Sequence, residues 1–440
     1  MRQPQSETLV LMMATNRETD SVQATLQGIR LVRDSVRDRI WQERQQRREE
    51  NCEQTYTRED LAVQAGIGID TLKRLLRGIR VRRTSADAIA RFLGLELADI
   101  IESSRSQRPS DFYVKRPPLE SKCYEIISLE PGALVRVKAP HRAGKTWFIE
   151  QLLHQVKEKQ DQYQSVTLSF CDADHAVFTG LQTFLRWFCI SVGNSLELPN
   201  KLDERWQDDL GNNSNCTNYF QTYLLAGINT PLVLVLDDVD LVFEEREVAD
   251  DFCKLLRGWY DGARRVRGDT WRNLRLVIVH STNIYGALDI NYSPLANVGE
   301  EFSLRNFYLK EVQQLVQQYN LHWQAEQVEQ IMTLIGGNPY LIHAALDYLT
   351  LHPETTLEQF LQSAATEVGP YHNYLGELLS TLRQNSNLAV AFKNIVNSAT
   401  PIRVEPAYVF QLYSMGLVEV EERGEVPSCE LYRQYFRDRL

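Results

Sequence analysis

No apolar run in this 440-residue sequence approaches the roughly 18–20 residues that cross a bilayer. The apolar stretch at 9–14 is too short, and polar residues follow it where a signal peptide has a small-residue cleavage site. Fixed-period repeats and low-complexity tracts are also absent. The sequence therefore predicts a soluble cytoplasmic protein of two to four domains, with no membrane partner.

Metal and disulfide staples are not indicated either. The seven cysteines form no CxxC pair, and no His–Cys cluster has zinc spacing, which favours buried free thiols. The histidines at 141, 175, 280 and 343 likewise show no metal-ligand spacing. Net charge is −10, which excludes a surface covered by nucleic acid but permits one local basic face.

The apolar pattern divides the chain into sections of different class. Residues 1–104 predict an all-helical domain, including a charged helix at 34–50. A Ser- and Arg-rich stretch at 105–112 contains proline and lacks periodicity, which predicts a linker. Between 113 and 303, strand-like runs alternate with helical patterns, which predicts βαβ units with right-handed crossovers.

The expected strands are nearly continuous in valine, leucine and isoleucine, as in parallel strands covered on both faces. They lie at 133–139, 165–171, 231–239 and 274–281, with helices at 144–160, 176–193 and 244–263. From 304 to 369 the pattern predicts a helical lid, with helices at 308–319, 324–335, 339–351 and 356–367. Residues 370–440 predict more helices, a hairpin turning at Gly424 and a final helix, an order typical of a winged helix. The fold class is therefore multidomain α/β.

The strongest motif is KAPHRAGKTWFIEQLL, which follows the first expected strand. It has the phosphate-binding pattern A-x-x-x-x-G-K-T. Backbone N–H groups of such a loop surround an anion, Gly144 permits close approach, and the next helix directs its positive end at the phosphates. Lys145 is expected on the β- and γ-phosphates and Thr146 on Mg²⁺. Ala139 replaces the usual first glycine, and its methyl is tolerated where φ is negative.

The whole loop is expected to contact nucleotide, with His141 and Arg142 facing the phosphates. The predicted cradle is Ala139, Pro140, His141, Arg142, Ala143, Gly144, Lys145, Thr146 and Trp147. The alternative is a helix N-terminus with an exposed lysine.

A second motif, LVLVLDDVDLVF, places Asp237 and Asp238 at the end of a buried strand. Asp237 is expected to bind the Mg²⁺ water shell, and Asp238 to orient or deprotonate the attacking water. The alternative is an aspartate pair that caps the next turn. Ser281, Thr282 and Asn283 follow another strand, either to sense the γ-phosphate or as a plain turn.

The segment LIGGNPYLIHAAL forms a third motif. Two glycines end one helix there and Pro339 begins the next at its favoured position. We expect a lid corner that brings Pro339 onto the nucleotide; the alternative is a simple helix–helix corner.

In the order APHRAGKT, LVLVLDD, VHSTN and GGNPYLIHAAL, these motifs resemble the STAND class of AAA-like P-loop ATPases. FYVKRPPLESKCYEIIS resembles the lead-in of a bacterial and cyanobacterial AAA-like family, and the tail resembles the winged helix that follows the lid. The resemblance implies a switch held by ATP or ADP, closed by the winged helix on ADP and self-assembling as a homo-oligomer on ATP. VHSTN contains no arginine and no arginine finger is evident, so slow or absent hydrolysis is expected.

Residues 56–101 follow a helix-turn-helix pattern, in which Thr57 caps the first helix and 65–67 form the turn. The second helix turns Leu72, Leu75 and Leu76 inward and presents its other face to a major groove. Six basic residues and no acidic one lie between 73 and 83, which predicts salt-dependent contacts to double-stranded DNA. The predicted DNA-binding residues are Asp70, Thr71, Lys73, Arg74, Arg77, Arg80, Arg82 and Arg83. The alternatives are a protein-binding adaptor and a module that only packs.

Three functions follow. The first is a nucleotide-gated switch with a DNA-binding module, in regulation, signalling or defence. The second is an adaptor ATPase that recruits an effector protein. The third is a DNA-associated ATPase of transposition or repair, which the missing arginine finger disfavours.

Overall fold

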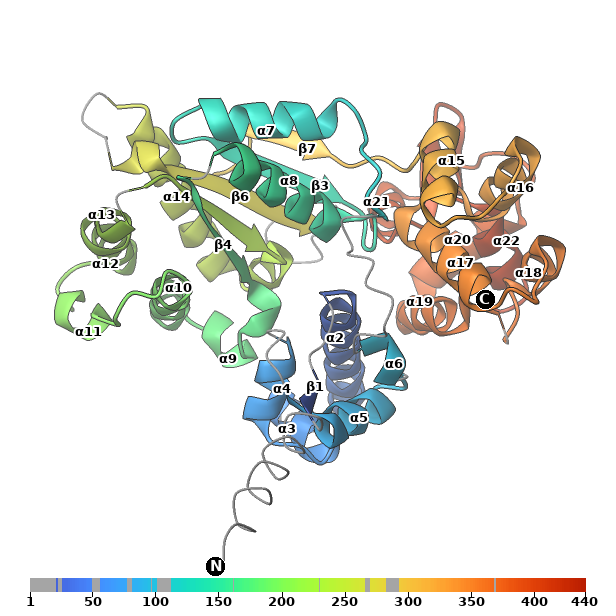
Figure 1. Cartoon of the computed structure of the whole chain (residues 1–440), viewed down its shortest axis with the longest axis horizontal. Coiled ribbons are helices and arrows are strands. Elements are labelled where there is room, and N and C mark those ends of the chain that lie inside the picture. Colours follow the sequence, from blue (N-terminus) through green and yellow to red (C-terminus); the bar gives the residue numbers. More distant parts are fainter. Residues whose placement is uncertain are drawn as a thin grey trace, which may run out of the picture. The chain divides into compact units, whose positions relative to one another are not determined.

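The structure is a computed structural model, and it divides into two compact units, Met1–Asp111 and Phe112–Leu440 (Figure 1). It describes residues 21–22, 26–49, 56–76, 81–95, 97–100, 112–160, 162–228, 230–265, 270–281, 293–367 and 369–440. None of the helices in these ranges has the length and apolar character needed to cross a bilayer. The finer boundaries at 303/304 and 369/370 stay predictions.

Unit 1 is built mainly from helices around a small apolar core. Thr57 caps the second of them: its hydroxyl accepts from Asp60 N at 3.3 Å, while the Asp60 carboxylate accepts from Thr57 N at 2.8 Å. Leu72, Leu75 and Leu76 are buried, as predicted. The helices are α2 (Leu26–Glu49), α3 (Arg58–Gln64), α4 (Ile69–Leu76), α5 (Arg83–Phe92) and α6 (Leu97–Ile100).

The all-helical expectation for this unit needs one correction. A short antiparallel pair joins β1 (Ser21–Val22) to β2 (Val81–Arg82). Val81 is buried, so tertiary packing of a β-branched side chain decides the extended conformation there.

Unit 2 contains a five-stranded parallel sheet in the order β4-β5-β6-β3-β7. All four predicted strands are present. β7 was missed because it is only four residues long and begins with two glutamates, so its register with β3 decides it. The strands are β3 (Leu134–Ala139), β4 (Gln164–Ser169), β5 (Leu232–Asp237), β6 (Leu274–Ser281) and β7 (Glu300–Ser303).

The two faces of the sheet carry different apolar side chains. Along β5, Val233 and Val235 pack with α7 (Leu119–Leu129) and α8 (Lys145–Lys159). The alternating leucines of β5 pack on the opposite face with α10 (Leu181–Ser195), α12 (Asn212–Tyr219) and α14 (Arg246–Ala263) (Figure 1). The continuous apolar run therefore has the expected cause, burial on both faces.

Three helical expectations for this core change. The helix predicted at 176–193 is divided into α9 (His175–Phe178) and α10. α14 begins two residues later than predicted, after the 3₁₀ segment η4 (Val239–Glu244). α12 was missed because it is mostly polar; it continues into a π-helical segment, η3 (Phe220–Leu224), and α13 (Leu225–Ile228), and its burial against α10 and α14 overrides its weak local signal.

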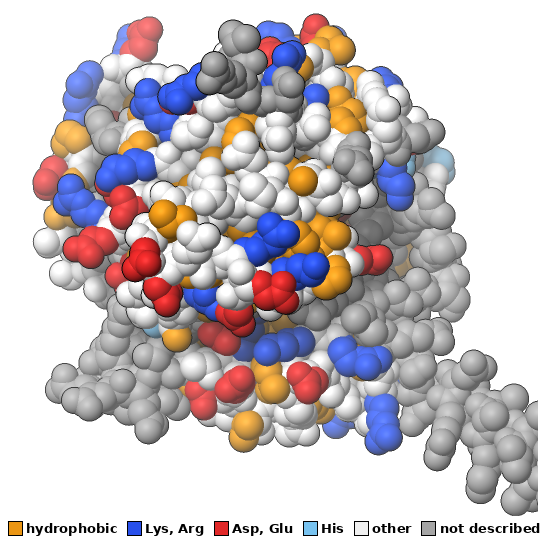
Figure 2. Space-filling view, turned by 90° about the vertical axis from the view of Figure 1, so that its left-hand side faces the viewer, with side chains coloured by type: hydrophobic (Ala, Val, Ile, Leu, Met, Phe, Trp, Pro, Cys, Tyr) orange, Lys and Arg blue, Asp and Glu red, His pale blue; other side chains and the backbone are white. Residues whose placement is uncertain are grey.

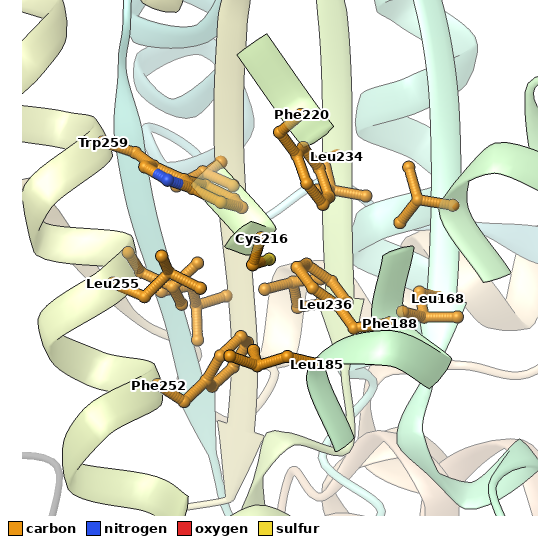
Figure 3. Packing of buried hydrophobic residues seen from close by; sticks show 14 of the residues in the cluster. Leu168, Leu185, Phe188, Cys216, Phe220, Leu234, Leu236, Phe252, Leu255 and Trp259 are labelled. Atoms are coloured by element: carbon orange, nitrogen blue, oxygen red, sulfur yellow. The ribbon is translucent and has the colours of Figure 1, made fainter. Parts of the chain in front are cut away.

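An aromatic cluster fills the leucine face (Figure 3). The ring of Phe188 lies 5.1 Å from Phe220, 5.5 Å from Phe252 and 6.3 Å from Trp259, between ring centroids. Cys189 and Cys216 belong to the same cluster. The six cysteines within the described ranges are buried and free, as the sequence predicted.

The helices that follow β7 share one apolar core with the C-terminal elements. The predicted hairpin is present, but Gly424 begins its second strand, and the turn lies at Glu422–Arg423. α18 ends at Ser363, earlier than expected. The winged-helix assignment stays a prediction. The elements are α15 (Leu309–Gln318), α16 (Ala325–Ile335), α17 (Pro339–Leu351), α18 (Leu357–Ser363), α19 (His372–Gln384), α20 (Ser386–Asn397), α21 (Pro406–Ser414), β8 (Val418–Glu421), β9 (Gly424–Pro427) and α22 (Glu430–Phe436).

On the face drawn in Figure 2, acidic and basic side chains are interspersed among the described residues. No field of a single sign covers this face, which agrees with the mixed composition of 48 Lys and Arg against 58 Asp and Glu.

We expect Phe188→Ala to lower the free energy of unfolding by about 3–5 kcal/mol, because it removes a ring at the centre of the aromatic cluster. Urea denaturation followed by tryptophan fluorescence measures the loss. Leu210→Ala is the control, since Leu210 is 38% exposed and should change stability by at most about 0.5 kcal/mol. Equal losses for the two variants would contradict this account of the core.

Candidate nucleotide-binding site

The loop between β3 and α8 has the backbone of a preformed anion cradle. Arg142 and Gly144 have φ values of 60° and 83°, a left-handed conformation that favours glycine at the second position. Ala139 is not among the described residues with positive φ, so its methyl is accommodated. No side chain caps the N-terminus of α8 among the described residues. Its first N–H groups therefore suit a phosphate.

Lys145, the predicted phosphate ligand, lies across this loop. Its amine donates to the carbonyl oxygens of Ala139 and Pro140, each at 3.1 Å. These are neutral acceptors on the same turn, and a phosphate oxygen is a stronger acceptor for an ammonium group. The lysine is thus positioned where the cradle would hold an anion.

The carboxylates and the sensor position meet the loop at one edge of the sheet. Ser281 is the register partner of Ala139, and Asp237 that of Ser169. Asp238 has a φ of 58°, and one carboxylate oxygen accepts the Ser169 hydroxyl at 2.9 Å. The carboxyl ends of these parallel strands therefore bring the predicted residues together, as in other open α/β sheets.

Asp240 is a functional candidate that the sequence argument missed, although LDDVD contains it. Both its carboxylate oxygens accept from Ser281 N, at 3.1 and 2.8 Å. Burial raises the pKa of Asp240 from 3.8 to about 6, against the opposing effects of the Ser281 hydrogen bond and the Lys145 charge. Asp240 therefore fixes the end of β6 beside the cradle.

Arg116 is a second missed residue, from the lead-in segment YVKRPP. It is 1% exposed, and Nη1 donates to the Ala143 carbonyl at 3.2 Å. Nη2 lies 3.6 Å from where a Cβ on Gly144 would be, and Nε has no hydrogen-bond partner in the described part of the chain. A buried cation with an unsatisfied donor beside the cradle fits an anionic ligand.

The lid corner reaches the same loop. A Cβ on Gly144 would lie 3.5 Å from Pro339 Cβ, so the predicted proline lies against the cradle. Gly337 permits this approach: its carbonyl accepts from Phe307 N at 2.7 Å, and a Cβ there would lie 2.1 Å from Phe307 O.

Aromatic rings continue this contact past the cradle. Trp147 lies 4.4 Å from the ring of His343 on α17. Burial and the Arg116 charge lower the pKa of His343 to about 3, so this imidazole is neutral.

The structure thus gathers residues 139–147, Asp237, Asp238, Ser281 and Pro339 around one edge of the sheet. Thr282 and Asn283 lie outside the described residues. Those that are described include no group of three or more His, Cys, Asp or Glu arranged to hold a metal ion. The predicted Mg²⁺ ligands, Thr146 and Asp237, would share the metal with phosphate and water.

The helix-turn-helix surface of unit 1 is arranged as predicted on α4. Asp70 and Arg74 are exposed, and Thr71 and Lys73 are half-buried. Arg82 and Arg83 are exposed at the start of α5. Arg77 and Arg80 lie outside the described residues.

Comparison with known proteins assigns the class. A family model described as an AAA-like domain matches residues 101–438, and the chain belongs to this AAA-like family. Residues 53–104 match a Cro/C1-type helix-turn-helix DNA-binding domain. None of the curated proteins compared with the chain matches it.

Solved structures show the same fold. A Walker-type ATPase of Pyrococcus abyssi is similar over 76% of this chain and 99% of its own, with 14% identity and a TM-score of 0.53. The Aeropyrum pernix ORC2 protein, in ADPNP–ADP complexes, covers 75% of this chain and 96% of its own, with 12% identity and a TM-score of 0.43. The Aeropyrum pernix ORC1 protein in complex with DNA covers 74% and 93%, with 12% identity and a TM-score of 0.40.

We expect Asp240→Asn to remove a pH dependence of stability from the nucleotide-free protein. The pKa of Asp240 is raised to about 6, so between pH 4 and 6 the folded state binds more protons than the unfolded state. Stability therefore falls as pH rises, by at most about 3 kcal/mol from this group. Urea denaturation of both proteins at pH 4 to 7 measures the difference, and parallel profiles would contradict it.

Proposed function

We propose that the protein is a nucleotide-held switch that binds ATP or ADP with Mg²⁺. The observation that carries the proposal is the cradle at Gly144 and Lys145, bordered by the sheet-edge carboxylates and Pro339. Lys145 would hold phosphate, Thr146 and Asp237 the metal, and Arg116 would add a second cation. The Walker-type ATPase of Pyrococcus abyssi, similar in fold, supports nucleotide binding.

Hydrolysis is proposed to be slow. Asp238 would orient the attacking water, and its hydrogen bond from Ser169 fixes one of its oxygens. The VHSTN segment contains no arginine to stabilise transition-state charge, a contribution worth about 10³–10⁵ in rate where one is supplied. The site therefore suits a timer that keeps its nucleotide.

The C-terminal elements would form a winged helix that acts as an internal latch. α21 contains no charged residue, and the hairpin exposes Glu419, Glu421 and Glu422, a surface that repels nucleic acid. A Cβ on Gly416, between α21 and β8, would lie 3.4 Å from Pro140 Cβ in the cradle. This contact supports closure on ADP, with self-assembly as a homo-oligomer when ATP replaces it.

The N-terminal module would bind double-stranded DNA. Its match to a DNA-binding helix-turn-helix family and the exposed Arg74, Arg82 and Arg83 support this role. The alternative is an adaptor that recruits an effector protein, and a pull-down with residues 1–104 separates nucleic acid from protein partners. A DNA-associated ATPase of transposition or repair is the third candidate, and ATP-dependent assembly on duplex without sequence preference would favour it.

We expect Lys145→Ala to reduce affinity for ATP by about 100-fold or more, because charge-assisted hydrogen bonds contribute about 1.5–3 kcal/mol each. Equilibrium titration with a fluorescent ATP analogue measures this. Lys157→Ala, an exposed lysine on the same helix, is the control. Full affinity in Lys145→Ala would show that the site is wrongly assigned.

We expect the triple variant Arg74→Ala, Arg82→Ala, Arg83→Ala to weaken duplex binding and flatten its salt dependence. The slope of log K against log salt should fall by about 0.9 for each lost phosphate contact. Fluorescence anisotropy between 50 and 200 mM salt measures it. Arg91→Ala is the control, since Arg91 is already paired with Asp87 at 2.8 Å. An unchanged slope would favour the adaptor.

A further inference from the structure

One cation of the cradle is held by side chains far along the chain. The guanidinium of Arg142 is 14% exposed, and its Nη2 lies 3.0 Å from Oε2 of Glu377 on α19. It also lies 4.6 Å from the ring centroid of Tyr340, on α17, and 4.8 Å from that of Tyr374, on α19. Two ring faces and one carboxylate thus surround a single planar cation.

This arrangement is stronger than an exposed ion pair. Stacking on aromatic faces is worth more when the cation is desolvated, and Arg142 is largely removed from water. The planar guanidinium can stack on rings and donate in its own plane at once, which a lysine ammonium cannot do. Separating α17 and α19 from the cradle would therefore expose the charge and both rings.

The same side chains are anchored in the C-terminal core. The hydroxyl groups of Tyr374 and Tyr432 lie 2.7 Å apart in a buried hydrogen bond, which joins α19 to α22. Tyr374 and Tyr432 belong to the apolar core shared by the lid and the C-terminal elements. A displacement of that core would consequently pull directly on Arg142.

The other contacts between the cradle and the C-terminal half lie close to Arg142 in sequence. Pro339 approaches Gly144 and Gly416 approaches Pro140, both at van der Waals distance. These contacts close the same surface but contribute only packing. The ion pair adds a charge interaction that a conservative substitution can remove without creating a cavity.

We propose that Arg142, Tyr340, Tyr374 and Glu377 form a clasp that closes the C-terminal half over the phosphate loop and sets the rate of nucleotide release. This inference rests on the proposed nucleotide site. Glu377 acts through Arg142 and is a positioning residue. Because coupling between two equilibria is reciprocal, a nucleotide that favours closure stabilises the clasp, and the clasp slows the departure of that nucleotide.

The test is the release of a fluorescent ADP analogue from the full chain, chased with excess unlabelled ADP. Glu377→Gln keeps the size of the side chain and removes its charge, and we expect release to be about 3–10-fold faster. Glu329→Gln, an exposed glutamate of α16, is the matched control and should release at the wild-type rate. Equal or slower release from Glu377→Gln would overturn the clasp.

A double-mutant cycle separates the clasp from general loosening. In an Arg142→Gln background, Glu377→Gln should change the release rate by less than about 1.5-fold, since the partner charge is already gone. A full acceleration in that background would overturn the proposal. Failure of the nucleotide site itself is distinct, because the wild-type chain would then bind no analogue.

The ring contact provides an independent variant. Tyr340→Leu removes one aromatic face at a half-buried position and should also speed release, whereas Tyr340→Phe keeps the face and should do so less. Circular dichroism shows whether each variant is folded. Equal rates for the leucine and phenylalanine variants would remove the stacking contribution from the clasp.

Discussion

Three cationic side chains converge on one short loop, and the arrangement of unit 2 depends on how their charge is balanced. Lys145 donates to two carbonyl groups of the loop, Arg116 donates to a third, and Arg142 pairs with Glu377. Backbone carbonyl groups only partly offset buried charge, which favours an anion at this position. The cradle, the lid and the C-terminal elements thus share one electrostatic requirement.

The sheet places this loop by dividing its apolar side chains between two faces. Valines of β5 and β6 pack under α7 and α8, and the larger leucines pack against the aromatic cluster. Burial on both faces fixes the strand register, because a shift by one residue would exchange the two sets. That register brings Ala139 beside Ser281, and Ser169 beside Asp237.

The lid and the C-terminal elements form one core, so events at the cradle reach the end of the chain. Phe307 approaches Gly337 so closely that no other residue fits, which fixes the corner that carries Pro339. From there, Tyr340, Tyr374 and Tyr432 connect the phosphate loop to α22. A nucleotide-dependent movement of this half would need little amplification, because packed cores have discrete arrangements.

The sequence by itself determined the elements whose signals are local: the loop ending in Gly144 and Lys145, the four long strands, the Thr57 cap and the proline that starts α17. Each depends on residues a few positions apart. Only the tertiary structure decided β7 and α12, which lack a local pattern and form through register and burial. It also decided the roles of Arg116 and Asp240 and the pairing of Arg142 with Glu377, 235 residues away. A contact over that distance has no periodicity in the sequence, because packing of whole elements creates it.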